Sequence, residues 1–128
     1  MFLVCGEVLF DFFVESAHGN LPRQVTFKAI AGGSPFNVAV GLSRLGIEAA
    51  LLTGISTDFL GKQLRQVLEK EGVSTRYLAP VDAATTLSLI RLDEQGIPHY
   101  SLYGQFKWAF VFEVAYSPAY DNGMESFP

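Results

Sequence analysis

The chain has 128 residues, of which 49% are hydrophobic and 17% are charged, and its formal net charge is −4. This is the length of one domain that can bury an apolar core. The negative charge argues against a nucleic-acid-binding surface, and no apolar run approaches the ~18 residues of a membrane span. Glu7 and Asp11 interrupt the N-terminal apolar run, which argues against a signal peptide. The single cysteine, Cys5, is expected to be a buried, reduced thiol in a cytoplasmic protein.

The N-terminal stretch 2–10 is predicted to form one buried strand of a parallel sheet, because both of its faces are apolar. Gly6 interrupts it, and Asp11 follows at its carboxyl end. Ligands of open α/β sheets bind beyond the carboxyl ends of the strands. Asp11 is therefore either a site residue or a turn residue that caps a local N–H. Residues 24–30 alternate in part and predict a half-buried strand.

Residues 31–46 are typical of a glycine turn that runs into one amphipathic helix. Ser34 is the expected N-cap, and Pro35 would then occupy the first helical position, where its missing N–H costs nothing. Gly46 is the expected stop.

Three residues of this stretch predict a ligand site. Gly32 and Gly33 lack a Cβ and let a ligand approach the main chain. Asn37, in the first helical turn, adds one acceptor and two donors. Such a site suits a neutral polyhydroxylated ligand or an anion. The alternative is a glycine-rich connection to a capped core helix, with no ligand.

After this helix, residues 48–53 predict a second parallel strand, 58–71 a surface helix and 73–78 a third strand. Asp58 is interpreted as the N-cap of the surface helix rather than as a catalytic carboxylate.

Residues 85–92 and 97–103 flank the turn Asp93-Glu94-Gln95-Gly96. Two apolar runs joined by a short turn that contains glycine predict a β-hairpin.

These patterns resemble the PfkB (ribokinase-like) family of carbohydrate kinases over residues 2–103. The matching features are Gly6-Glu7-x-x-x-Asp11, the Gly-Gly pair with Asn37, and Gly54-x-x-x-Asp58-x-x-Gly61. The resemblance implies an α/β protein, the N-terminal part of a ribokinase-like three-layer α/β/α fold with a small β-sheet lid. It places the kinase part at 1–104, with lid strands near 12–30 and 85–103, and leaves out the C-terminal half of the fold.

The resemblance also implies site residues. Asp11 and Asn37 would hydrogen-bond sugar hydroxyls, while Gly32 and Gly33 would let the sugar approach the backbone. Tyr103 falls where fructokinase-like members place an aromatic side chain near the sugar, although packing is the alternative for it. The family activity is ATP-dependent phosphorylation of a sugar hydroxyl.

ATP and Mg²⁺ are implied by the family, but the chain lacks its second motif, Asp-Thr-x-Gly-Ala-Gly-Asp, whose last Asp is the catalytic base. We therefore assign no catalytic residue and expect the chain to be inactive alone. The tail, 105–128, is foreign to the family pattern and suggests a shifted reading frame or a truncated product. If ordered, it should pair as a strand.

Two other functions remain open. The chain could be a non-catalytic sugar-binding or dimerisation module, with a homodimer formed through the lid sheet. A nicotinamide-binding domain is disfavoured, because no G-x-G-x-x-G follows the first strand. The sugar is also open: a phosphosugar would favour a converging cation, and whether Lys28 or Arg91 faces the site is not evident from the sequence.

Overall fold

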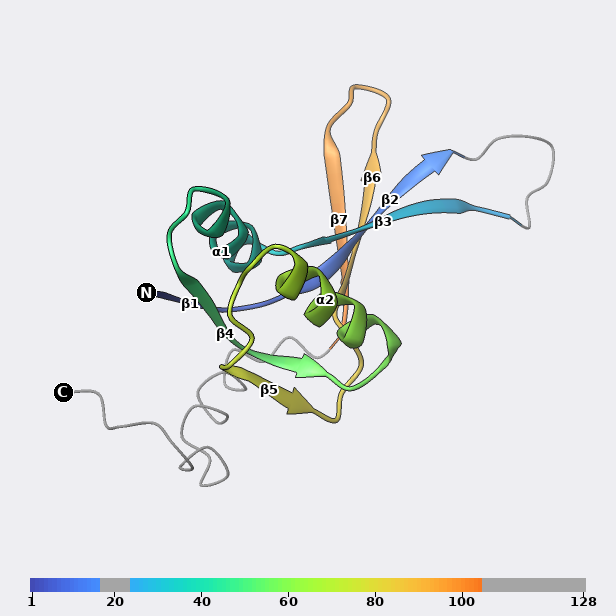
Figure 1. The fold of residues 1–128 in the computed structure, drawn as a ribbon. Helices are drawn as coiled ribbons and strands as arrows, with labels where there is room; N and C mark the ends of the chain where they lie inside the picture. The colour runs from blue at the N-terminus through green and yellow to red at the C-terminus, as the bar shows by residue number, and fades with distance from the viewer. Residues whose placement is uncertain (17–23, 105–128) are drawn as a thin grey trace.

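The computed structural model describes residues 1–16 and 24–104, and Figure 1 shows how their elements are arranged. The elements in chain order are β1 (Phe2–Cys5), β2 (Leu9–Ser16), β3 (Thr26–Gly32), α1 (Ser34–Arg44), β4 (Ala49–Ser56), α2 (Phe59–Lys70), β5 (Leu78–Val81), β6 (Leu87–Leu92) and β7 (Pro98–Tyr103).

The first sheet is parallel, in the order β1-β4-β5, and both helices pack against its central strand β4. Leu51 of β4 is fully buried, as are Leu64 and Leu68 of α2. The predicted surface helix places Leu64 and Leu68 one turn apart on the same face, and this face contacts the sheet. The core therefore forms between the strands and one side of each helix, as expected for an α/β fold.

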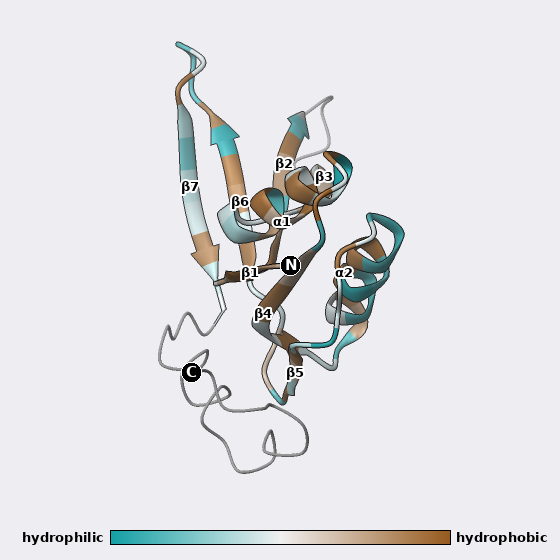
Figure 2. Cartoon of the chain, turned by 60° about the vertical axis from the view of Figure 1, so that its left-hand side comes forward, coloured by the Kyte–Doolittle hydropathy of each residue, from teal (hydrophilic) through white to brown (hydrophobic). Residues whose placement is uncertain are grey.

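The second sheet has the order β3-β2-β6-β7, in which only β2 and β6 run parallel to each other. Figures 1 and 2 show it extending away from α2 and β5. The predicted hairpin is confirmed as β6 and β7, and Asp93 Oδ1 closes its turn by accepting the N–H groups of Gln95 and Ile97 at 2.9 Å each. The α/β class with a small additional sheet is confirmed.

The prediction of one buried strand over 2–10 is wrong, because the chain changes sheets at Gly6. β1 belongs to the first sheet and β2 to the second. Gly6 has φ +141°, and a Cβ there would lie 2.4 Å from Pro35 Cγ, so the crossing needs glycine. Among the described residues β1 pairs only with β4. At this edge Cys5 is exposed, so the expected buried thiol is also wrong.

The third predicted strand, 73–78, is displaced along the chain. Only Ser74 makes an isolated bridge, to Ala50, and a turn in which the N–H of Leu78 donates to the carbonyl of Thr75 precedes β5. The strand expected in the tail lies outside the described residues, and the division at residue 104 stays a prediction. Neither helix of the described part is long and apolar enough to cross a membrane.

Candidate functional site

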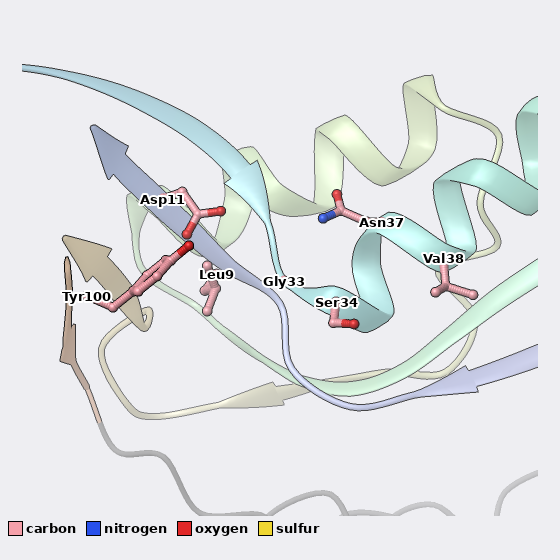
Figure 3. Close-up of a pocket in the computed structure, with 7 residues that line it drawn as sticks. All are labelled: Leu9, Asp11, Gly33, Ser34, Asn37, Val38 and Tyr100. Carbon is pink, nitrogen blue, oxygen red and sulfur yellow. The ribbon is translucent and has the colours of Figure 1, made fainter. Parts of the chain in front are cut away.

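An open pocket of ≈ 610 Å³ lies between the second sheet and the start of α1 (Figure 3). Its volume falls within the range of small-molecule sites, roughly 300–1,000 Å³. It is lined by Leu9, Asp11, Gly33, Ser34, Asn37, Val38 and Tyr100. These residues come from β2, from the β3–α1 junction, from the first turn of α1 and from β7. Elements distant in sequence therefore converge on one cavity.

Asp11 is the third residue of β2, inside the second sheet, rather than a residue that follows the first parallel strand. It pairs with Ile30 of β3 on one side and with Ser88 of β6 on the other. Burial raises the pKa of the Asp11 carboxyl above its usual value, and the neighbouring Ser88 hydroxyl partly offsets this shift. A partly desolvated carboxylate is a strong acceptor for hydroxyl groups.

Gly32 leaves room for this carboxylate. A Cβ on Gly32 would lie 2.5 Å from Asp11 Oδ2, well inside contact distance. Gly32 itself is buried at the end of β3 and is absent from the pocket lining. The absence of a side chain on Gly32 thus leaves room for the Asp11 carboxylate. The sequence had suggested instead that a ligand approaches the Gly32 backbone directly.

Gly33, which does line the pocket, is the N-cap of α1, and the prediction that Ser34 takes this position is wrong. Gly33 has φ +106° and ψ 139°, a conformation that residues with a Cβ rarely adopt. The helix therefore begins one residue earlier than predicted, with Ser34 as its first residue and no side chain bonded to the cap. Ser34 is left on the pocket wall instead.

Asn37 is held in the first turn of α1 by its backbone N–H, which donates to the Gly33 carbonyl at 2.9 Å. Figure 3 shows its amide and the Asp11 carboxylate facing the same space from opposite sides of the pocket. The structure thus brings together Asp11, Gly33 and Asn37, three of the five residues singled out in the sequence.

Tyr103 does not line this pocket, whereas Tyr100 does. Successive side chains of a strand point to opposite faces, so two tyrosines three residues apart on β7 lie on different faces of the sheet. The hairpin register, which pairs Tyr100 with Ile90, determines the face that each occupies. Counting residues outward from the predicted turn could have shown that Tyr100 and Tyr103 lie on different faces of the sheet. No pattern in the sequence identified Leu9, Ser34 or Val38 as pocket residues.

The described residues contain no group of three or more His, Cys, Asp or Glu side chains that could hold a metal ion. The polar side-chain groups that line the pocket are the Asp11 carboxylate, the Asn37 amide and the hydroxyls of Ser34 and Tyr100. Such a set can exchange hydrogen bonds with several hydroxyl groups of one small molecule.

Comparison with known proteins places this chain in a family. The model for "pfkB family carbohydrate kinase" matches residues 1–102, which include every residue of the pocket. The chain belongs to the pfkB family of carbohydrate kinases. The expected family is thereby confirmed, together with its ribokinase-like fold.

The chain is similar to a fructokinase of Rhizobium leguminosarum bv. trifolii, with 36% identity over 72% of this chain and 27% of that protein. A 5-dehydro-2-deoxygluconokinase of Clostridium botulinum is 36% identical over 66% of this chain and 25% of that protein. A crystal structure of fructokinase with bound ATP from Xylella fastidiosa superimposes with a TM-score of 0.72 at 30% identity, covering 80% of this chain and 32% of that one. The chain thus spans between about a quarter and a third of the length of these pfkB relatives.

Proposed function

We propose that this chain forms the sugar-binding part of an ATP-dependent sugar kinase of fructokinase or ribokinase type. The observation that supports it is the shared pocket of Asp11, Gly33 and Asn37. In this proposal the Asp11 carboxylate accepts hydrogen bonds from sugar hydroxyls, and the Asn37 amide both donates and accepts. The ring of Tyr100 packs against the C–H face of the sugar. Gly33, which has no side chain, lets the sugar approach the backbone at the start of α1.

The proposal assigns no phosphoryl-transfer step to this chain. Such a reaction needs a phosphate cradle, a divalent metal and a base, and the sequence lacks the glycine-rich Asp motif that supplies the base in pfkB kinases. We therefore expect ATP and Mg²⁺ to need residues other than those described, and the chain alone to be inactive, since loss of a general base costs about 10²–10⁴-fold. A cytoplasmic location is part of the same proposal.

Titration calorimetry of the 128-residue chain with D-fructose and D-ribose tests the sugar site. We expect one of these sugars to bind, and Asp11→Ala and Asn37→Ala each to weaken binding at least about tenfold, because each removes hydrogen bonds worth about 1.5 kcal/mol or more. Asp82→Ala is the matched control, since Asp82 is an exposed carboxylate outside the pocket. Unchanged affinity in both pocket variants, or no binding of either sugar, would contradict the proposal.

Gly32→Ala tests the same pocket without removing a ligand group. The new Cβ would meet the end of the Asp11 side chain, which can rotate, and no rigid backbone atom within 3.5 Å. We expect sugar binding to fall at least about tenfold while stability changes by about 1 kcal/mol or less. A large loss of stability with unchanged sugar affinity would show that Gly32 is needed for the fold and not for the position of the Asp11 side chain.

A dimerisation module is the second candidate, and an exposed apolar surface favours it. On the face of the second sheet that carries Asp11, several apolar side chains are exposed, namely Phe13, Ile30, Leu92, Tyr100 and Leu102. Apolar surface of this kind marks interaction sites, and a second copy would cover it by sheet-to-sheet packing. A chain that sediments as a dimer and binds neither sugar would favour this function over the sugar site.

A further inference from the structure

The Asp11 carboxylate, which faces the pocket (Figure 3), lies between two small residues of the neighbouring strands. On the β3 side, Gly32 leaves free the space in which a Cβ would lie 2.5 Å from Asp11 Oδ2. On the other side, β6 runs parallel to β2 and pairs Ser88 with Asp11. Paired residues of neighbouring strands point to the same face of a sheet, so the Ser88 side chain lies beside that of Asp11.

Ser88 is a polar residue in an otherwise apolar part of β6. Its neighbours along the strand are Leu87, Leu89 and Ile90, and Ser88 itself is only 3% exposed. A buried hydroxyl needs a hydrogen-bond partner, and the Ser88 hydroxyl has one in the Asp11 side chain. An ionised carboxylate can only accept, so the hydroxyl donates.

This hydrogen bond acts on both the charge and the direction of the Asp11 side chain. Burial disfavours the ionised carboxylate and raises its pKa, whereas the bond from Ser88 favours the ionised form and lowers the pKa. A hydroxyl that holds a carboxylate also limits the rotamers that the side chain adopts. Ser88 therefore helps to keep a charged acceptor pointed at the pocket.

We infer that Ser88 is a positioning residue of the sugar site, whose hydroxyl holds the ionised Asp11 carboxylate in place before a sugar enters. Ser88 is not one of the pocket-lining residues, so it acts through Asp11. The inference rests on the proposed sugar-binding function and adds a residue to it. A side chain that is already ordered loses less rotational freedom when the ligand binds, which favours binding.

Ser88→Ala tests the hydroxyl by titration calorimetry of the 128-residue chain with whichever of D-fructose and D-ribose binds it. We expect the affinity at neutral pH to fall about two- to tenfold, the range for ordering one side chain on binding. Ser101→Ala is the matched control and should leave the affinity unchanged. Ser101 is an exposed hydroxyl residue of β7, and it pairs with Leu89 on the face of the sheet away from Asp11.

The pH dependence of binding separates positioning from packing. Sugar binding by an ionised carboxylate weakens as the pH falls through the pKa of Asp11. Without the Ser88 hydroxyl this pKa rises further, so Ser88→Ala should lose the sugar at a higher pH than the unmodified chain does. An NMR titration of the Asp11 carboxyl carbon measures the same shift without sugar.

Other titratable groups are the same in both proteins. On this face of the described sheet, or beside it at the start of β2, the other titratable side chains are Glu7, Glu15, Lys28 and Tyr100. None of them is changed by the substitution, so a difference between the two pH curves reports the loss of the Ser88 hydroxyl.

Ser88→Cys separates the hydroxyl from the space that it fills. A thiol occupies the same position but is a weak hydrogen-bond donor. We therefore expect this variant to lose affinity as Ser88→Ala does, and it also provides the test if the alanine variant does not fold. Circular dichroism of each variant checks folding.

The outcomes keep this inference apart from the proposed function. If a sugar binds and removal of the Ser88 hydroxyl changes neither the affinity nor its pH dependence, the inference is overturned and the sugar site stands. It is also overturned if the affinity falls while the Asp11 pKa does not move, or if Ser88→Cys binds like the unmodified chain, because Ser88 then only fills space. If neither sugar binds the unmodified chain, the sugar-binding function fails, and the inference fails with it.

Discussion

Gly33→Ala should destabilise the protein by about 2–4 kcal/mol, since two separate penalties combine. The backbone at Gly33 has φ +106° and ψ 139°, which an alanine adopts only under strain. The added Cβ would also lie 2.9 Å from the carbonyl oxygen of Glu7, a backbone atom that cannot rotate away. Urea unfolding followed by circular dichroism measures the loss. Sugar binding should be lost as well, because the turn forms one wall of the pocket.

Gly41→Ala is the matched control for this prediction, because Gly41 lies in the same helix, α1. A Cβ there would meet no atom within 4 Å. Alanine is favoured over glycine in a helix interior by up to about 1 kcal/mol, so this variant should be neutral or stabilised. Equal destabilisation by the two alanines would show that helix α1 as a whole, and not the turn at Gly33, tolerates no change.

Asp58→Ala should cost about 2–4 kcal/mol, because one carboxylate holds two parts of the fold together. Its Oδ1 accepts the N–H of Gly61 at 2.7 Å and caps α2, as the sequence predicted. The carboxylate also accepts from Thr85, through the backbone N–H at 2.8 Å and the hydroxyl at 2.6 Å. Thr85 is buried just before β6, so Asp58 joins helix α2 to the second sheet. Urea unfolding measures the cost.

Asp58 also makes stability depend on pH. Burial acts to raise the pKa of Asp58, but the hydrogen bonds from Thr85 and Gly61 outweigh it and hold the pKa at about 2, below the usual 3.8. The folded state therefore prefers the ionised form. This contribution is complete above about pH 4 and is lost as the pH falls toward 2, by on the order of 1–2 kcal/mol after allowance for its partial exposure. Unfolding midpoints between pH 5 and pH 2 measure it, and Asp58→Ala should flatten this dependence.

Two variants control the Asp58 prediction. Asp82→Ala removes an exposed carboxylate at the surface and should change stability by no more than about 0.5 kcal/mol. Asp58→Ser keeps a capping oxygen but cannot serve both Gly61 and Thr85, so it should restore only the capping part, about 1 kcal/mol. Full recovery by serine would mean that the link to Thr85 contributes nothing to stability.

Local rules predicted the parts of this protein whose signals lie within a few residues. The repeat of Leu64 and Leu68 on one face of α2, the Asp58 cap and the Asp93 turn each depend on neighbours in the sequence, and each is confirmed. The N-cap of α1 was misplaced by one residue, because cap preferences favour serine, whereas the chain turns at Gly33, where a Cβ would lie 2.9 Å from the carbonyl oxygen of Glu7.

By itself, the sequence determined the family, the hairpin and the helices, and it identified Asp11 and Asn37 as members of one candidate site. Only the tertiary structure decided that residues 2–10 divide between two sheets, that Tyr100 rather than Tyr103 faces the pocket, and that neither Lys28 nor Arg91 lines it. The physical reason is that a side chain's face depends on strand register and on the element packed opposite. Register is set by contacts between segments far apart in the chain, and shifting it by one residue turns every side chain to the other face.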